Sequence, residues 1–146
     1  MDSWENEAKF VLKERRKDNK VLFRDDDENH TLRKENNKFV RKWGFSYNDM
    51  WDLDAEIARF ILPRLAYFRA HNDSFPGIFV KETDDEEENR KQSEAAEQKW
   101  DRILETICDG LHLYLEKGFQ WFNKEEEERW ATAKQYLFEY FEYLWF

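Results

Sequence analysis

One stretch of the chain decides the fold: GFSYNDMWDLDAEIARFILPRLAYFR, residues 44–69. Apolar residues recur in it at steps of three and four, the spacing that places side chains on one face of a helix; they are Met50, Leu53, Ile57, Phe60, Ile61, Leu65 and Phe68. Gly44 permits the positive backbone angle that ends a preceding segment, and Ser46 is a good helix N-cap. We therefore expect a core helix over residues 46–70. Its apolar stripe is widened by Trp51, Ala58, Leu62 and Tyr67, so several neighbours are expected to cover it.

The composition favours long helices in a single domain over residues 1–146. The chain has 26 aromatic residues (seven Trp, six Tyr and thirteen Phe) but only four Gly and two Pro, and few turn-forming residues leave few loops. The 33 acidic and 24 basic residues give a formal charge of −9, which disfavours direct binding to nucleic-acid phosphates. The single cysteine, Cys108, excludes an internal disulfide and favours a reducing compartment. No run approaches the roughly 18 apolar residues of a membrane span.

Three further helices complete the expected fold, an all-α bundle of about four main helices. They are predicted near residues 3–18, 95–117 and 124–145. The middle one has the strongest stripe, made of Ala96, Trp100, Ile103, Leu104, Ile107, Leu111, Tyr114 and Leu115. Residues 31–43 are a weaker candidate for an additional helix.

Local signals mark the ends and contacts of the later helices. Gly110 interrupts the stripe of the helix over 95–117, which predicts a close approach of another helix there. Gly118 is a natural residue to end that helix. Asn123 with Glu126 forms a capping box that starts the last one.

The central helix contains three residues that do not suit a helix core. Pro63 removes one backbone hydrogen bond, so we expect a kink or a break near it. Asp54 and Arg64 project among the apolar positions. Because a buried charge needs a partner, we expect both side chains to be at least half buried, each with a polar partner in a neighbouring loop or helix, or in a polar pocket.

Two acidic segments are interpreted as solvated. The segment from Asp25 to His30 starts like a calcium loop, but His30 replaces the required Gly and Asn36 replaces the required Glu. Residues 81–94 carry mainly charges, which fit either a loop or a solvated extension of the next helix.

The C-terminal helix has more aromatic residues than one buried face can hold. Seven of the eleven residues from Tyr136 to Phe146 are aromatic. We expect a homodimer through this helix that buries Phe138, Tyr143, Trp145 and Phe146. A central position of the helix in the bundle, or a foreign partner, would bury the same residues.

Several segments resemble a family of small, uncharacterised bacteriophage proteins. These are the run from Phe45 to Asp52, FILPRL at 60–65 and FPG at 75–77; the WDRIL segment at 100–104, continuing to Gly110-Leu111, is similar to the next helix of that family. The resemblance covers roughly residues 44–118. It implies a setting, the cytoplasm of an infected bacterial host, and brings no assigned activity.

Signals for catalysis are thin. The glycines are scattered, His30, His71 and His112 lie in different segments, and no serine or cysteine nucleophile has a base beside it in sequence. We therefore expect no enzyme activity, no catalytic residue, no cofactor and no metal site. A carboxylate–metal hydrolase would need Asp49, Asp52 and Glu56 to be joined by carboxylates from another helix.

The function expected from these features is a non-catalytic, acidic phage protein that inhibits a host defence or metabolic protein. The alternative is a small-ligand protein, such as a sponge for a nucleotide signal, in which aromatic rings stack on the base and arginines hold phosphate. The candidate residues for either partner are Trp51, Asp54, Arg64, Tyr67, Arg69 and Trp100.

Overall fold

The computed structural model describes residues 3–22, 27–45 and 47–145, and this part of the chain is helical without a strand. It contains five α-helices: α1 (Ser3–Leu22), α2 (Asp27–Trp43), α3 (Leu53–His71), α4 (Glu86–Lys117) and α5 (Lys124–Glu139). Short 3-10 helices lie between or after them: η1 (Tyr47–Met50), η2 (Gly77–Phe79), η3 (Phe119–Trp121) and η4 (Phe141–Tyr143). The all-α prediction is confirmed.

Several predicted boundaries are wrong. The central helix begins at Leu53 instead of residue 46, because residues 47–50 form the separate helix η1; Ser46, its expected cap, lies outside the described residues. α5 ends at Glu139, six residues earlier than predicted, and η4 follows it. The weak candidate over 31–43 is a full helix that starts at Asp27, so residues 27–30 belong to α2 and not to an acidic loop.

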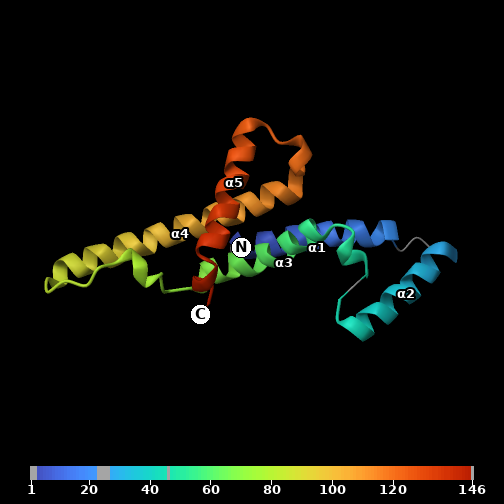
Figure 1. The fold of residues 1–146 in the computed structure, drawn as a ribbon, viewed down its shortest axis with the longest axis horizontal. Helices are drawn as coiled ribbons and strands as arrows, with labels where there is room; N and C mark the ends of the chain where they lie inside the picture. The colour runs from blue at the N-terminus through green and yellow to red at the C-terminus, as the bar shows by residue number, and fades with distance from the viewer. Residues whose placement is uncertain (1–2, 23–26, 46, 146) are drawn as a thin grey trace.

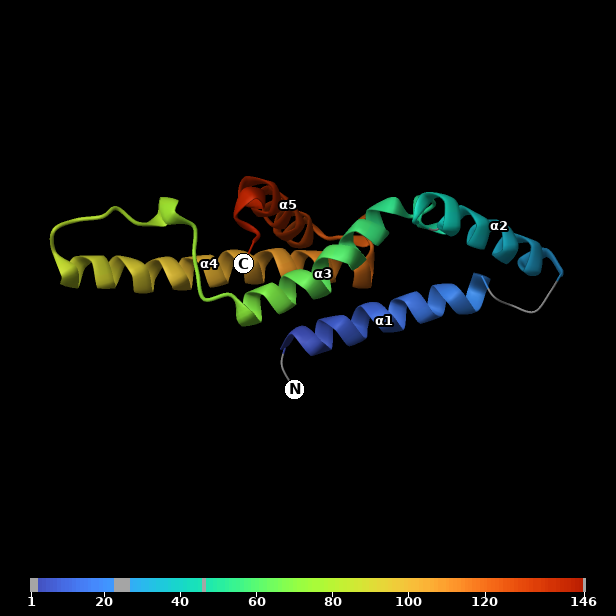
Figure 2. The same ribbon diagram turned by 90° about the horizontal axis from the view of Figure 1, so that it is seen from below.

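The helices pack in the order α1, α3, α4 and α5, each on the next. α1 and α3 lie side by side, α4 crosses α3, and α5 crosses α4 steeply (Figures 1 and 2). The result is elongated, with α2 beyond the N-terminal end of α3 (Figure 1). The core forms where these layers meet, from Val11 of α1, Ala58, Leu62, Leu65, Ala66 and Phe68 of α3, Trp100, Ile103, Leu104, Ile107, Cys108 and Leu111 of α4, and Leu137 and Tyr140.

The ends of α4 and α5 follow the predicted signals. Gly118 has a φ of 81°, a left-handed conformation that glycine adopts without strain, and its N–H bonds to the carbonyl of Tyr114. Asn123 and Glu126 form the complete capping box at the start of α5.

The acidic segment over 81–94 is mostly helix, since α4 begins at Glu86 with Asp85 as its cap. The preceding loop runs back along α4 (Figure 2) and is tied to it by side chains. Asn89 donates to the carbonyl of Thr83 at 2.8 Å and accepts from its N–H at 3.0 Å, and the Lys81 N–H donates to Gln92 at 2.8 Å. These bonds explain how α4 extends past the other helices with few apolar residues.

α3 continues through Pro63. A break at this residue is therefore excluded, and a kink there stays a prediction.

Candidate protein-interaction surfaces

α3 leaves one apolar face uncovered. Leu53, Ile57, Phe60, Arg64 and Tyr67 follow one another at steps of four and three, so they share one face. The four apolar members keep between 42% and 56% of their surface exposed, and Arg64 is also exposed. We call these five residues the α3 surface. Beside it, Trp51 is 74% exposed.

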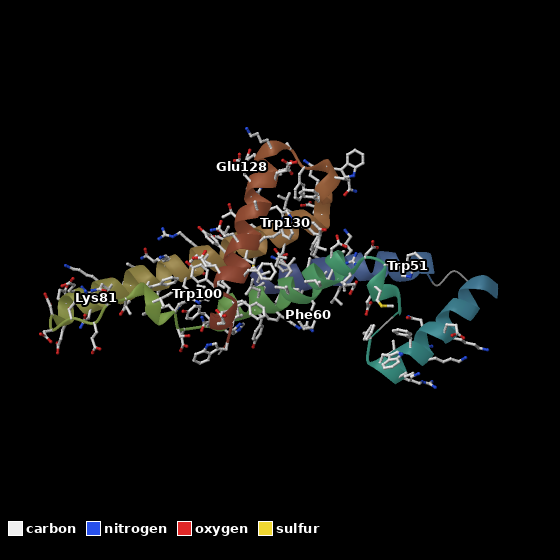
Figure 3. The ribbon with its side chains drawn as sticks, in the orientation of Figure 1. Trp51, Phe60, Lys81, Trp100, Glu128 and Trp130 are labelled. Carbon is white, nitrogen blue, oxygen red and sulfur yellow. The ribbon has the colours of Figure 1, made fainter. Side chains whose placement is uncertain are left out.

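This surface overturns part of the predicted core. Met50, Leu53, Ile57 and Phe60 were expected inside, but the buried residues of α3 are Ala58, Leu62, Leu65, Ala66 and Phe68. α3 thus has two apolar faces, and the neighbouring helices cover only one of them. α1 reaches one edge of the α3 surface, where Trp4 meets Tyr67 edge to face at 5.0 Å. α4 lies beyond the other edge, where Tyr114 donates to Asp54. In Figure 3, Phe60 lies on the side of α3 away from α5.

Arg64 is held over the α3 surface by its own helix. Its guanidinium carbon lies 3.9 Å from the ring centroid of Phe60, and its Nη1 donates to the Phe60 carbonyl at 2.9 Å. The predicted burial of Arg64 is wrong, because this residue projects from the uncovered face. Its polar partner is a carbonyl of its own helix, and not a neighbouring loop or helix as expected. A cation in the middle of an apolar stripe gives this surface a charge that a partner must match.

Asp54 is also exposed, so its predicted burial is wrong as well. Its predicted polar partner is confirmed: the Tyr114 hydroxyl of α4 donates to the carboxylate, and this bond holds the pKa of Asp54 below its usual value. Burial, assisted by the Asp54 carboxylate, raises the pKa of Tyr114 to about 12. The Tyr114 ring stacks on Trp130 of α5 at 4.5 Å. Asp54 therefore joins α3 to the core of the fold.

Arg69 joins α3 to α4. Its Nε and Nη2 donate to the two carboxylate oxygens of Asp101 at 2.7 and 2.9 Å, and Glu105 lies 3.4 Å from Nη2. The hydrogen bonds to Asp101 raise the pKa of Arg69, and in return they lower the pKa of Asp101. Such a bidentate pair fixes the relative position of the two helices.

Arg69 and Trp100 line a common cleft of about 280 Å³ with Asn72, Asp73, Ser74, Glu97, Asp101 and Leu104. Trp100 is only 3% exposed and packs between Phe79 and Tyr140, so its ring belongs to the core. Trp51 lies at the other end of α3, far from Trp100 (Figure 3). The structure therefore brings together Arg69 and Trp100 of the predicted ligand residues, while Trp51, Arg64 and Tyr67 lie at or beside the α3 surface.

The C-terminal segment has a second uncovered apolar surface. Phe138, Phe141 and Trp145 are 62% to 73% exposed, and we call them the C-terminal surface. Of the other residues predicted for self-association, Tyr143 packs against the core and Phe146 lies outside the described residues. Phe141 was missed, because a continuous helix would place it on the buried face with Leu137 and Tyr140; the end of α5 at Glu139 turns it outward.

The most acidic part of the chain lies at the tip of α4. Six of the seven residues from Glu82 to Glu88 are acidic, and all six are exposed. Asp85 accepts from the N–H groups of Glu87 and Glu88, so this charge complements the helix dipole. Within the described residues, no three His, Cys, Asp or Glu side chains are grouped so as to hold a metal ion. None of the helices in the described part is long and apolar enough to cross a membrane.

Comparison with known proteins adds no relative: no family model, curated protein or solved structure matches the chain.

Proposed function

We propose that this protein is a non-catalytic interaction protein, encoded by a bacteriophage, that binds and inhibits a host protein in the cytoplasm of the infected cell. The observation that carries the proposal is the uncovered aromatic surface. Phe138, Phe141 and Trp145 face solvent at the C-terminal end, and α3 exposes a second apolar stripe. Monomeric proteins rarely expose apolar patches beyond a few hundred Å², and larger ones mark contacts with other proteins.

The charge supports a protein partner with a basic surface. The formal charge of −9 and the acidic tip of α4 repel nucleic acid and attract cationic surfaces over a distance of about a Debye length. A host protein that itself binds nucleic acid has such a surface. The resemblance of residues 44–118 to small phage proteins supports the setting.

The C-terminal surface accommodates either a second copy or a foreign protein. Its aromatic residues suit a second copy, as in the predicted homodimer, and equally suit any other apolar partner. The two polar residues beside them, Glu139 and Glu142, are both acidic. Two copies pairing here would bring like charges together, which costs affinity. This balance favours a foreign, basic partner at the C-terminal surface.

Capture of host proteins tests the proposal. Tagged wild type is expressed in the bacterial host and compared with a Phe138→Asp/Trp145→Asp variant, in which both exposed rings are replaced by charges. The expected result is one host protein in stoichiometric amount with the wild type and its loss from the variant; the purified host protein should lose activity when wild type is added. Identical captured proteins from both chains, or full activity of the captured protein in the complex, would contradict the proposal.

The small-ligand alternative has one supporting observation, the cleft that Arg69 and Trp100 share. The charge of the cleft opposes the binding of a nucleotide, because three acidic residues line it, Asp73, Glu97 and Asp101. In addition, the Arg69 guanidinium already donates hydrogen bonds to Asp101. Calorimetry with cyclic and linear nucleotides tests it. The alternative requires tighter binding to Asp101→Asn, in which Arg69 is released, than to wild type.

A further inference from the structure

The α3 surface has the dimensions of half a helix–helix interface. Its residues from Leu53 to Tyr67 span about 21 Å of helix at 1.5 Å per residue. The exposed area follows from the exposed fractions of its apolar side chains together with those of Met50 and Trp51. With 150–250 Å² for a whole aromatic side chain, these residues expose on the order of 600 Å². That is at the upper limit for a patch on a monomer and approaches the roughly 800 Å² that each partner gives to a stable interface.

The order of residues on this surface is symmetric about Phe60. Leu53 lies seven residues before Phe60 and Tyr67 lies seven residues after it, while Ile57 and Arg64 lie three and four residues away. A second α3 helix running in the opposite direction therefore meets apolar residues at the centre and at both ends of the stripe. Leu53 faces the partner's Tyr67, and the two Phe60 rings meet at the centre. Steps of four and three are those at which two helices pack side by side.

The charges distinguish between the two directions. Three other charged residues of α3 are already bonded within the fold, Asp54 to Tyr114, Arg69 to Asp101 and Glu56 to Arg59 at 2.7 Å, whereas Arg64 projects from the α3 surface. An antiparallel pair centred on Phe60 keeps the two exposed Arg64 side chains about 12 Å apart along the helices, because each lies four residues from the axis at 1.5 Å per residue. A parallel pair would instead place the two exposed Arg64 side chains at the same level. The helix dipoles also favour the antiparallel direction.

We propose that two copies of the chain pair through the α3 surface as an antiparallel, twofold-symmetric dimer with its axis near Phe60. An isologous interface of this kind needs a surface that is complementary to itself, and the apolar residues of the α3 surface are arranged symmetrically about Phe60. The inference goes beyond the proposed function, because the dimer covers α3 and leaves the C-terminal surface for the host protein.

The molar mass in solution is the first test. Light scattering coupled to gel filtration should give twice the 18.1 kDa of the chain for wild type. Phe60→Asp should give the mass of one chain, because it buries two carboxylates against each other at the axis. Phe138→Asp is the matched control: it makes the same change at an exposed phenylalanine outside α3 and should stay dimeric. Circular dichroism melts show that both variants are folded.

Two outcomes overturn the proposal. A wild type of one-chain mass at tens of micromolar excludes the dimer, and a monomeric Phe138→Asp beside a dimeric Phe60→Asp moves the contact to the C-terminal surface. The first outcome leaves host capture by the C-terminal surface unaffected. In the second, a second copy competes with the host protein for that surface, and the capture experiment tests the proposed function separately. If Phe60→Asp does not fold, the exposed Ile57 gives a second variant. Ile57→Asp should raise the dimer dissociation constant at least about tenfold, because it buries an unpaired carboxylate in the interface, whereas Ile57→Leu should stay dimeric. Equal dissociation constants for the two variants would place Ile57 outside the interface and overturn the proposal.

Cysteine crosslinking tests the direction. Phe60→Cys alone should form a disulfide-linked dimer on oxidation, because the two positions meet at the axis. Leu53→Cys alone should not, since its two copies lie roughly 21 Å apart and a disulfide needs Cα atoms within about 7 Å. An equal mixture of Leu53→Cys and Tyr67→Cys chains should crosslink. Cys108 is buried and present in every chain, so it is a common background. Crosslinking of Leu53→Cys to itself would show a parallel pair and overturn the proposal.

Discussion

Gly110 of α4 lies directly against Ala133 of α5, so close that a methyl group on Gly110 would overlap the Cβ of Ala133. The two helices cross at this point, and the ring of Trp130 covers the same site. The glycine inside the α4 stripe predicted such a close approach, and the prediction is confirmed. Its partner was not predictable, since nothing in the sequence near Gly110 specifies Ala133.

Gly110→Ala is therefore expected to destabilise the protein, although alanine favours helix over glycine by about 1 kcal/mol. The added methyl group meets a Cβ atom that cannot move without its backbone, and overpacking of this kind costs about 1–3 kcal/mol. Urea unfolding measures the change. Gly77→Ala is the control, because no atom lies within 4 Å of a Cβ at Gly77. An unchanged or higher stability of Gly110→Ala would mean that α4 and α5 separate at little cost.

The same isoleucine-to-alanine substitution can be compared at a buried position, Ile107, and at an exposed position, Ile57. Ile107 of α4 has no exposed surface and Ile57 belongs to the α3 surface. Ile107→Ala should lower the free energy of unfolding by about 2–5 kcal/mol, because a cavity forms in a packed core; Leu65→Ala should do the same. Ile57→Ala should change it by less than about 0.5 kcal/mol in a monomeric background such as Phe60→Asp. Equal losses at Ile107 and Ile57 would show that α3 is covered on both faces.

Local signals were predictable because they act within one turn of helix. Gly118 ends α4 and Asn123 starts α5 through contacts with residues at most four positions away. The fold class followed from periodicity in the same way. What could not be predicted was which face of α3 is covered, since periodicity identifies apolar positions but not the neighbours that pack on them.

The positions of Asp54 and Arg64 show the same limit. Both project among apolar residues of α3, which suggested burial. Arg64 lies on the uncovered face and reaches solvent, and Asp54 bonds to Tyr114, sixty residues away in sequence. Trp100 was a candidate for stacking but is enclosed by Phe79 of η2 and by Tyr140, and these contacts depend on how α4 meets η2 and the C-terminal segment.

Acid should destabilise the contact between α3 and α4. The Arg69 hydrogen bonds hold the pKa of Asp101 below its ordinary value of 3.8, so the carboxylate contributes stability that is fully present above that value. This contribution is lost as the pH falls through the lowered pKa of the folded protein. Unfolding measured from pH 6 down to about pH 2 should therefore show a smaller loss for Asp101→Asn than for wild type.

The partner residue provides the control for the acid prediction. Arg69→Met should reduce the pH dependence as Asp101→Asn does, and the double variant should show no further reduction, because both changes remove one interaction. Parallel acid profiles for wild type and Asp101→Asn would show that the pair does not stabilise the fold.

Alkaline titration tests the bond between Tyr114 and Asp54. Burial and the neighbouring carboxylate raise the pKa of Tyr114 to about 12, so the neutral phenol stabilises the fold fully below the unfolded value of about 10. That contribution is lost between these two pH values. The tyrosinate absorbance of wild type minus that of Tyr114→Phe should have its midpoint near pH 12. Repeating the difference in an Asp54→Asn background should move the midpoint toward 10. A midpoint at the ordinary value in both backgrounds would mean that Tyr114 is solvated and unbonded.

The last four residues should separate folding from partner binding. Tyr143 and Leu144 pack against the core, whereas Trp145 is exposed. Ending the chain at Glu142 should therefore lower the free energy of unfolding by about 1–3 kcal/mol, the cost of exposing one or two partly buried apolar side chains. Trp145→Asp should leave the stability within about 0.5 kcal/mol of wild type and still weaken host capture, because it changes only the C-terminal surface. Urea unfolding and quantitative capture, measured on the same two variants, check both parts. A Trp145→Asp chain that loses stability as the truncated chain does would place Trp145 in the core, and a truncated chain that captures the host protein at wild-type strength would place the partner site elsewhere.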